Sequence, residues 1–211
     1  MQFTKADIEA MPSRYRAHFV NSLSGYKSAN LVGTVDSEGH TNLAIVSSVV
    51  HLGAHPPLVA MVVRPDVVER HTLANIRANG WFTLNQVHRP FWQAAHQTSA
   101  KYEHTDSEFS AVGLSPEFIG ECVAPFVKES ALKYAVKLVR EQVIEENGTI
   151  LLIGSIEHGV VKEQALCSDG HIDLNALETV AVTGLDGYHL GNRLGRLSYA
   201  QPHQWPTPLD E

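Results

Sequence analysis

The stretch from Asn42 to Leu58, Asn-Leu-Ala-Ile-Val-Ser-Ser-Val-Val-His-Leu-Gly-Ala-His-Pro-Pro-Leu, constrains the fold of this chain more than any other. It begins as a β-branched strand with Ser47 and Ser48 in its middle. It then passes through a loop rich in Gly, His and Pro into a second apolar run that ends at Val63. Buried strands favour Val, Ile and Leu throughout. The two adjacent hydroxyls are therefore either satisfied within the sheet or face a polar ligand that lies on it.

The rest of the chain continues this pattern of strands separated by turn signals, among them Asn147-Gly148. No βαβ alternation and no GxGxxG motif is present, which excludes a Rossmann core. Helices are predicted at residues 6–11, at 71–80 with Thr72 as N-cap and Gly80 as the stop, at 89–102, and as one turn at 173–178. The predicted class is mainly β with inserted helices, a closed or half-closed antiparallel barrel. The predicted strands are residues 28–35, 41–50, 58–64, 81–85, 132–144, 149–161 and 180–182.

Composition and charge exclude several classes of protein. With 211 residues, 44% of them hydrophobic and 18% charged, the chain suits one large globular domain or one domain with an appendage. The net charge of −7 argues against a nucleic-acid or anionic-membrane binder. No apolar run approaches the roughly 18 residues that span a bilayer, and the N-terminus lacks the pattern of a secretory signal. Cys122 and Cys167 have no CxxC spacing, so we expect free thiols in a reducing cytoplasm.

The twelve histidines invite a metal-binding interpretation. His51 and His55 are four residues apart, but Gly53 and Pro56 disfavour a helix that would place them on one face. No HExxH motif and no paired Cys/His box is present. The sequence therefore predicts no bound metal, and the histidines are interpreted as scattered surface residues.

A group of polar residues follows the strand predicted at 58–64. Arg64 ends that strand, and His71 and Thr72 begin the next helix. A helix amino end offers free N–H groups and a partial positive charge, and an arginine adds a bidentate fork for phosphate. These residues form either a phosphate pocket or, alternatively, a plain N-cap at Thr72 beside a solvated strand end.

The segment from Ala95 to Tyr102, Ala-His-Gln-Thr-Ser-Ala-Lys-Tyr, holds more polar groups than an amphipathic helix surface needs. It is a candidate binding segment, or else a helix end that satisfies its own carbonyls. No Ser/His/Asp arrangement and no GxSxG motif is readable. A phosphate pocket without a nucleophile motif fits a reaction whose chemistry a cofactor carries.

Over residues 25 to about 165, the order and spacing of these features resemble the flavin reductase-like, FMN-binding split-barrel family. Many flavin reductases of two-component monooxygenases lack the residues of segment 95–102 and the extension after Val161. The acceptor specificity of those relatives is therefore not transferred to this chain. The resemblance rests on Leu31-Val-Gly-Thr, Gly39, Asn42-Leu-Ala, Ser47-Ser48, Pro56-Pro57-Leu58, Arg64, His71-Thr72, Asn75-Ile76 and Phe82-Thr-Leu-Asn85, followed by residues 95–102, Glu108-Phe109 and 125–130.

The resemblance implies a six-stranded, Greek-key-like antiparallel split barrel that forms a homodimer and binds FMN, or FAD, near the subunit interface. It implies one domain over residues 1–211, with a core at about 25–165 and a C-terminal extension at 166–211. Residues 42–49 would line the isoalloxazine ring, Arg64, His71 and Thr72 would lie near the phosphate, and the others would complete the pocket. The implied cofactor-binding residues are Asn42, Ala44, Ser47, Ser48, Val49, Arg64, His71, Thr72, Asn85, His96, Gln97, Thr98 and Ser99.

The sequence therefore predicts an FMN-binding oxidoreductase in which NADH or NADPH reduces flavin, with no side chain required as acid or base. One alternative is a non-enzymatic FMN electron carrier of the same fold. Another is a flavin-free sheet protein that binds a partner through the long loop at 103–130.

Overall fold

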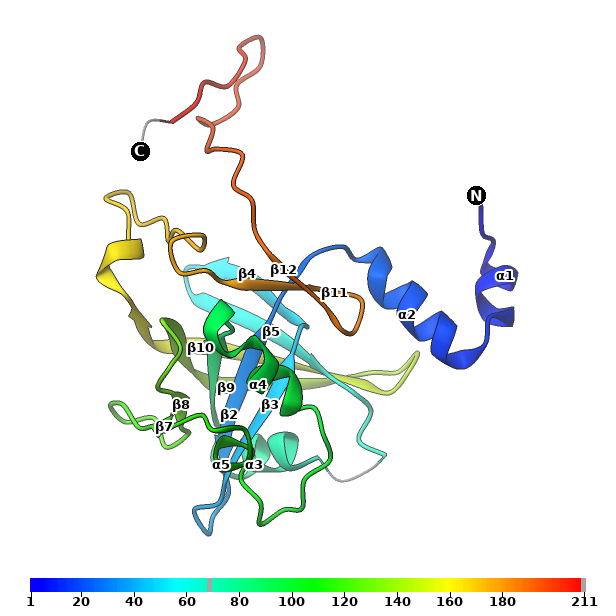
Figure 1. Cartoon of the computed structure of the whole chain (residues 1–211), viewed down its shortest axis with the longest axis vertical. Helices are drawn as coiled ribbons and strands as arrows, with labels where there is room; N and C mark the ends of the chain where they lie inside the picture. The colour runs from blue at the N-terminus through cyan, green and yellow to red at the C-terminus, as the bar shows by residue number, and fades with distance from the viewer. Residues whose placement is uncertain (68–69, 210–211) are drawn as a thin grey trace.

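The computed structural model describes residues 1–67 and 70–209, and its centre is one seven-stranded antiparallel sheet in the order β3-β2-β6-β9-β10-β5-β4 (Figure 1). The predicted mainly β class with inserted helices is confirmed. The strands of this sheet are β2 (Asn30–Val35), β3 (Thr41–Val46), β4 (Val49–Ala54), β5 (Pro57–Val63), β6 (Trp81–Gln86), β9 (Leu132–Ile144) and β10 (Thr149–Val161).

The sheet differs from the predicted six-stranded barrel, because it has seven strands and β3 and β4 remain its two unpaired edges in the part of the chain that the structure describes. The single strand predicted at 41–50 was wrong. The chain leaves the sheet at Ser47 and Ser48, and β4 begins at Val49 and pairs with β5 through Met61. The barrel is therefore split at the two serines.

The β9–β10 hairpin is the longest part of the sheet, with 13 residues in each strand, and both strands have the predicted bounds. Gly148 in the turn has a φ of +71°, which glycine adopts without the steric cost that other residues meet. The hairpin joins the two halves of the sheet, since β9 pairs with β6 and β10 pairs with β5.

The helices fill the connections between strands. α1 is close to its predicted bounds and carries a capping box between Thr4 and Asp7, but α2 has no counterpart in the prediction. The predicted helix at 89–102 is instead a 3-10 turn followed directly by a short helix. This helix ends before Thr98, whose hydroxyl donates to the Ala95 carbonyl. The helices are α1 (Lys5–Ala10), α2 (Ser13–Leu23), α3 (His71–Asn79), α4 (Trp92–Gln97) and α5 (Glu108–Val112), with 3-10 turns η1 (Arg89–Phe91) and η2 (Glu163–Ala165).

Part of the C-terminal extension joins the core through a second, three-stranded sheet. β11 (Val180–Thr183) pairs with β12 (Gly187–Leu190) and with β1 (Lys27–Ser28), which directly precedes β2. The predicted strand at 28–35 thus serves two sheets. The helical turn predicted at 173–178 is a non-helical turn. The remaining pair is β7 (Pro116–Glu117) with β8 (Phe126–Val127).

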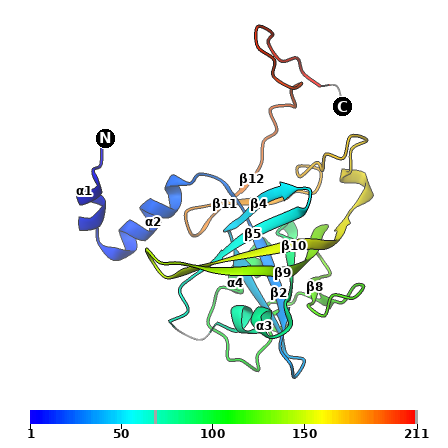
Figure 2. The same ribbon diagram turned by 180° about the vertical axis from the view of Figure 1, so that it is seen from behind.

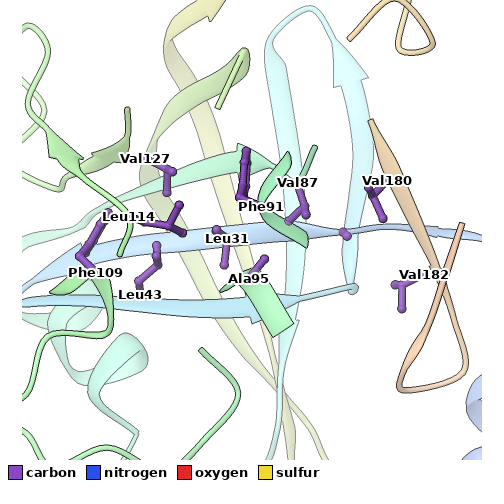
Figure 3. Close-up of a cluster of buried hydrophobic side chains, with 11 residues drawn as sticks. Leu31, Leu43, Val87, Phe91, Ala95, Phe109, Leu114, Val127, Val180 and Val182 are labelled. Atoms are coloured by element: carbon purple, nitrogen blue, oxygen red, sulfur yellow. The ribbon is translucent and has the colours of Figure 1, made fainter. Parts of the chain in front are cut away.

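Strand β2 is buried along its whole length and separates two hydrophobic clusters. Leu31 faces the cluster formed with β3, α4, α5 and β11, and Figure 3 shows Leu43, Phe91 and Ala95 gathered around it. The next residue, Val32, faces the opposite cluster, which joins β5, β6, β9 and β10 to α3. This alternation is the period-2 geometry of a strand buried on both faces.

Both ends of the chain extend away from the sheet (Figures 1 and 2). None of the residues of α2 is buried, and Tyr199 and Trp205 in the C-terminal tail are 89% and 90% exposed. Among the described residues, no helix is both long enough and apolar enough to cross a bilayer. Both cysteines are free, with Cys122 buried and Cys167 partly exposed.

Candidate functional site

The two serines at the split between β3 and β4 differ in their contacts. The Ser48 hydroxyl donates to the Val62 carbonyl at 2.6 Å, and the Val62 amide donates back to the Ser48 carbonyl at 3.2 Å. Ser48 therefore belongs to the pairing of β4 with β5. The half-buried Ser47 side chain forms no hydrogen bond with any residue in 1–67 or 70–209. Its hydroxyl is the one that a ligand at the split can use.

A polar cluster ties the start of β3 to the first turn of α3. The Asn42 side-chain amide donates to the Thr72 hydroxyl at 3.0 Å and to the Thr34 hydroxyl at 3.2 Å. The Asn75 amide donates to Thr34 from the next turn of the helix. Asn42 and Thr72, which lie thirty residues apart in the sequence, are thus in direct contact, as a joint site requires.

Among the residues that the structure describes, no side chain caps the amino end of α3, and the prediction of Thr72 as N-cap was wrong. The N-cap is Arg70, which makes no side-chain capping bond, and the helix begins at His71. Thr72 lies in the first turn of the helix. Its hydroxyl oxygen accepts from the Asn42 side-chain amide, and among the described residues its hydroxyl proton is not donated to any acceptor. The first backbone N–H groups of a helix lack internal acceptors and favour an anion.

Arg64 is exposed one residue beyond the end of β5. Within the described ranges it forms no hydrogen bond and no ion pair, so its guanidinium is available. A direct contact between Arg64 and Thr72 is not found among these residues.

The segment that follows α4 is anchored to β3. The buried Thr98 hydroxyl accepts from the Ile45 amide at 3.0 Å, so it holds the end of α4 against β3 at a residue two positions before Ser47. His96 Nδ1 lies 2.8 Å from the Tyr188 hydroxyl of β12, and the exposed Gln97 donates to the Tyr102 hydroxyl at 3.3 Å. The Thr98–Ile45 bond therefore brings the end of α4 to β3, whereas the His96 and Gln97 side chains bond to tyrosines outside the strand.

The remaining predicted residues lie in two settings. Ala44 and Val49 are half-buried on either side of the split, and Ser99 is exposed after α4. Asn85 is fully buried, and the protein uses each of its polar atoms. Its amide nitrogen donates to the Leu31 carbonyl and the Thr83 hydroxyl, and its oxygen accepts from the Val127 amide at 2.8 Å. These contacts give Asn85 a structural role between β6 and β8.

Glu108 is a buried residue of this region that the sequence reasoning did not select as a site residue. Its carboxylate accepts from the Leu43 amide of β3 at 2.8 Å, and burial raises its pKa above the usual 4.5. The neighbouring Ser107 hydroxyl lies 2.7 Å from the Thr41 hydroxyl. The sequence shows only a carboxylate beside Phe109, followed by the helix stop Gly113. That this carboxylate binds the Leu43 amide of β3 is decided by the tertiary fold.

A separate hollow of about 650 Å³ lies between η1, α4 and the C-terminal extension, lined in part by Phe91, Leu114 and Leu177. The buried His88 borders it, and burial lowers the pKa of His88 to about 4, so the ring is neutral. Its Nε2 accepts from the Ala131 amide at 3.0 Å. None of the predicted cofactor-binding residues lines this hollow.

The fold and the sequence together define a flavin reductase-like split-barrel protein. The sequence model of the flavin reductase like domain matches residues 23–172, so the chain belongs to that family. A comparison with functionally curated proteins finds no match.

Solved structures agree with this assignment. The crystal structure of a protein from Shewanella frigidimarina NCIMB 400, assigned as a flavin reductase with a split barrel domain, is 54% identical with a TM-score of 0.91 and covers 95% of this chain and 100% of its own. Nitrilotriacetate monooxygenase component B from Bacillus cereus is 21% identical, with a TM-score of 0.81 over 93% and 98% of the two chains. Flavoredoxin of Desulfovibrio vulgaris is 22% identical, with a TM-score of 0.71 over 85% and 92%. At these lower identities the likeness concerns the fold alone.

Proposed function

We propose that the chain is an FMN-binding oxidoreductase of the flavin reductase type, in which NADH or NADPH supplies the hydride. Membership of the flavin reductase-like family supports an oxidoreductase. The observation that carries the proposal is the Asn42–Thr72 hydrogen bond, which joins the strand leading to Ser47 to the uncapped amino end of α3. A ring site and a phosphate site are thereby linked through one polar contact.

The residues of this region fit the phosphate of FMN. The amino end of α3 offers N–H groups without a side-chain cap, and the Thr72 hydroxyl, oriented by Asn42, has its proton free to donate. Arg64 adds a charged donor after β5, and His71 begins the helix. In this proposal His71, Thr72 and Arg64 bind the phosphate, and Asn42 positions Thr72.

The split between β3 and β4 fits the ring system. Flavin, when bound, supplies the hydride-accepting and electron-transferring chemistry. Ser47 would donate a hydrogen bond to the ring from the split, while Ala44 and Val49 would supply apolar contact on either side. His96, Gln97 and Ser99 would lie beside the ring, since the bond from the Ile45 amide to Thr98 holds the end of α4 against β3. These groups would bind and orient the cofactor.

We also propose that the chain acts as a homodimer with the cofactor near the subunit interface. Val50 and Val62, on the outer face of the β4–β5 pair, are 55% and 38% exposed. The arm formed by α1 and α2 carries exposed Tyr15 and Leu23 without packing on its own sheet. Exposed apolar surface of this kind marks protein–protein contact.

The absorption spectrum of the protein as purified from a flavin-replete host tests flavin binding, and NADH and NADPH oxidation with added FMN or FAD tests turnover. We expect bound or readily bound FMN and oxidation of one nicotinamide. Bound flavin without oxidation of either nicotinamide would leave the electron carrier as the correct function. A colourless protein whose fluorescence does not respond to FMN would favour the flavin-free alternative.

The phosphate assignment is tested by comparing FMN with riboflavin, which differs only by the phosphate. Thr72→Ala and Arg64→Ala should each weaken FMN binding by about tenfold, the effect of losing roughly 1.4 kcal/mol, and leave riboflavin affinity unchanged. Equal losses for both ligands would show that these residues do not meet the phosphate.

A further inference from the structure

We propose that Asp36, His40 and His104 form a binding site for one divalent transition-metal ion of the Zn²⁺ class. Their potential ligand atoms, Asp36 Oδ2, His40 Nδ1 and His104 Nε2, all lie within 4.8 Å of one another. None of these three residues belongs to the proposed cofactor site, although the His104 ring contacts His71 of that site. The test therefore measures metal binding directly, without flavin.

The spacing of the ligand atoms suits a small metal ion. Asp36 Oδ2 lies 2.9 Å from His40 Nδ1 and 3.6 Å from His104 Nε2. In a tetrahedral zinc site with metal–nitrogen bonds of about 2.0–2.1 Å, neighbouring ligand atoms are about 3.3 Å apart. These two separations lie on either side of that value, and the third, between the two histidine nitrogens, is within 4.8 Å, so binding requires the side chains to close around the ion.

The Asp36 carboxylate is already oriented for this role. Its Oδ1 accepts hydrogen bonds from the backbone amides of Glu38 and His40, each at 2.8 Å, which directs Oδ2 toward the two rings. Such contacts to the far oxygen of a ligating carboxylate raise metal affinity by holding the ligand in position. The Glu38 carboxylate, 3.8 Å from His40 Nδ1, adds negative charge beside the site.

The donor set selects the class of metal. Two imidazole nitrogens and one carboxylate oxygen suit zinc, cobalt or nickel, whereas magnesium and calcium require a shell of oxygen ligands. The His40 and His104 side chains are 39% and 46% exposed, so water can occupy the remaining coordination positions. In neutral imidazole one nitrogen is unprotonated, and Nδ1 of His40 binds the metal when the ring proton is on Nε2.

The sequence did not reveal this site, because its ligands come from two segments. Asp36 and His40 belong to the turn between β2 and β3, and His104 belongs to the loop between α4 and α5. Without metal, the Asp36–His40 hydrogen bond simply closes the turn. A bound ion would tie the loop to the turn. The His71 ring lies against His104, with ring centroids 4.8 Å apart, so the tie would form beside the start of α3.

The proposal is tested with the tag-free full chain, titrated with ZnCl₂ against a chromophoric chelator. We expect one Zn²⁺ per chain in the micromolar range or tighter, a loss of at least tenfold in affinity in Asp36→Asn and in His104→Asn, and no detectable competition by Mg²⁺. His158→Asn is the matched control, because His158 is an exposed histidine on β10 that lies outside the cluster. Affinity that is unchanged in His104→Asn, or equally reduced in His158→Asn, would overturn the proposal.

The rate of backbone hydrogen exchange gives a second test, because non-specific binding of zinc to the surface would not slow exchange in one particular loop. Zn²⁺ should slow exchange in residues 99–107 of the unsubstituted chain and of His158→Asn, but not of His104→Asn. Circular dichroism of the metal-free variants checks that each one is folded. Binding without added protection of residues 99–107 would contradict the proposed tie between the loop and the turn.

Discussion

The two edge strands of the main sheet, β3 and β4, differ in whether the chain's own side chains bind their backbone. At the β3 edge, the amides of Leu43 and Ile45 are bound by side chains from the same chain, Glu108 and Thr98. At the β4 edge, Val50 and its neighbours are exposed. An open edge is a template for pairing with another chain, so proteins cover it or disrupt it.

The barrel stays split between these two edges. Two backbone amides of β3 are already bound by the Glu108 and Thr98 side chains, so β4 cannot use them. The edge closed by the chain's own side chains is the one that borders the candidate cofactor site, and the open edge is the one that we propose for contact with a second subunit. Substitutions at the two edges should therefore have different consequences.

The largest expected effect is at Glu108. Glu108→Ala removes the acceptor of the Leu43 amide and leaves a buried N–H group unsatisfied, which should lower the free energy of unfolding by about 2 kcal/mol. Urea denaturation at several protein concentrations measures this loss and separates it from dissociation. A change below about 0.5 kcal/mol would show that the β3 edge does not depend on Glu108.

Glu108→Gln is the matched control, because it retains an acceptor without the charge. Burial raises the pKa of Glu108 by more than the Leu43 amide and the nearby His71 lower it, so the folded chain holds the Glu108 proton more tightly than the unfolded chain does. This contribution is full below the unfolded-state pKa near 4.5 and is lost as the pH rises through the folded-state pKa. The wild type should therefore gain stability relative to Glu108→Gln as the pH falls toward 4.5. A constant difference across this range would contradict the raised pKa.

Thr98 should show the next largest effect at the same edge. Thr98→Val keeps the shape but removes the hydroxyl that binds Ile45 and Ala95, which should cost roughly 1 kcal/mol of unfolding free energy. Thr98→Ser retains the hydroxyl and should lose less. If valine and serine variants unfold at the same urea concentration, the hydroxyl is not what anchors α4.

The two serines at the split should differ by a smaller amount. Ser48→Ala removes the bond to the Val62 carbonyl at an exposed position and should cost about 0.5 kcal/mol, while Ser47→Ala should leave the apoprotein unchanged. Flavin titration should show the reverse order, with the larger loss of affinity in Ser47→Ala. Equal flavin affinities in the two variants would remove Ser47 from the proposed site.

The smallest effect on the folded chain itself is expected at the β4 edge. Val50→Asp places a charge on the exposed face and should change the unfolding free energy of the monomer by less than about 0.5 kcal/mol. It should weaken self-association instead, as measured by analytical ultracentrifugation. If Val50→Asp at low protein concentration lowers the unfolding free energy as much as Glu108→Ala does, the two edges do not differ in the way proposed.

The sequence alone determined the elements whose signals are local. The β9–β10 hairpin was predicted with its bounds, because its strand-forming residues and the turn signal Asn147-Gly148 between them are local. The two register shifts along the pair, between Ile153 and Gly154 and between Ile156 and His158, were not predicted. The end of α3 was predicted because Gly80 adopts the left-handed conformation that stops a helix. The family resemblance also depended on short runs of residues, and the match to the family model establishes that the chain belongs to the family.

Only the tertiary structure decided which groups meet. The break at Ser47 and Ser48 divides a run that is strand-forming in sequence, and the β3 part of that run is bound by Glu108 and Thr98 from more than fifty residues away. Helix α3 begins at His71, and the Thr72 hydroxyl accepts from Asn42 and does not cap the helix. The Asp36, His40 and His104 cluster joins two segments that share no sequence motif. Strand and turn formation depend on neighbours in sequence, whereas hydrogen-bond partners and metal ligands depend on distances that only folding sets.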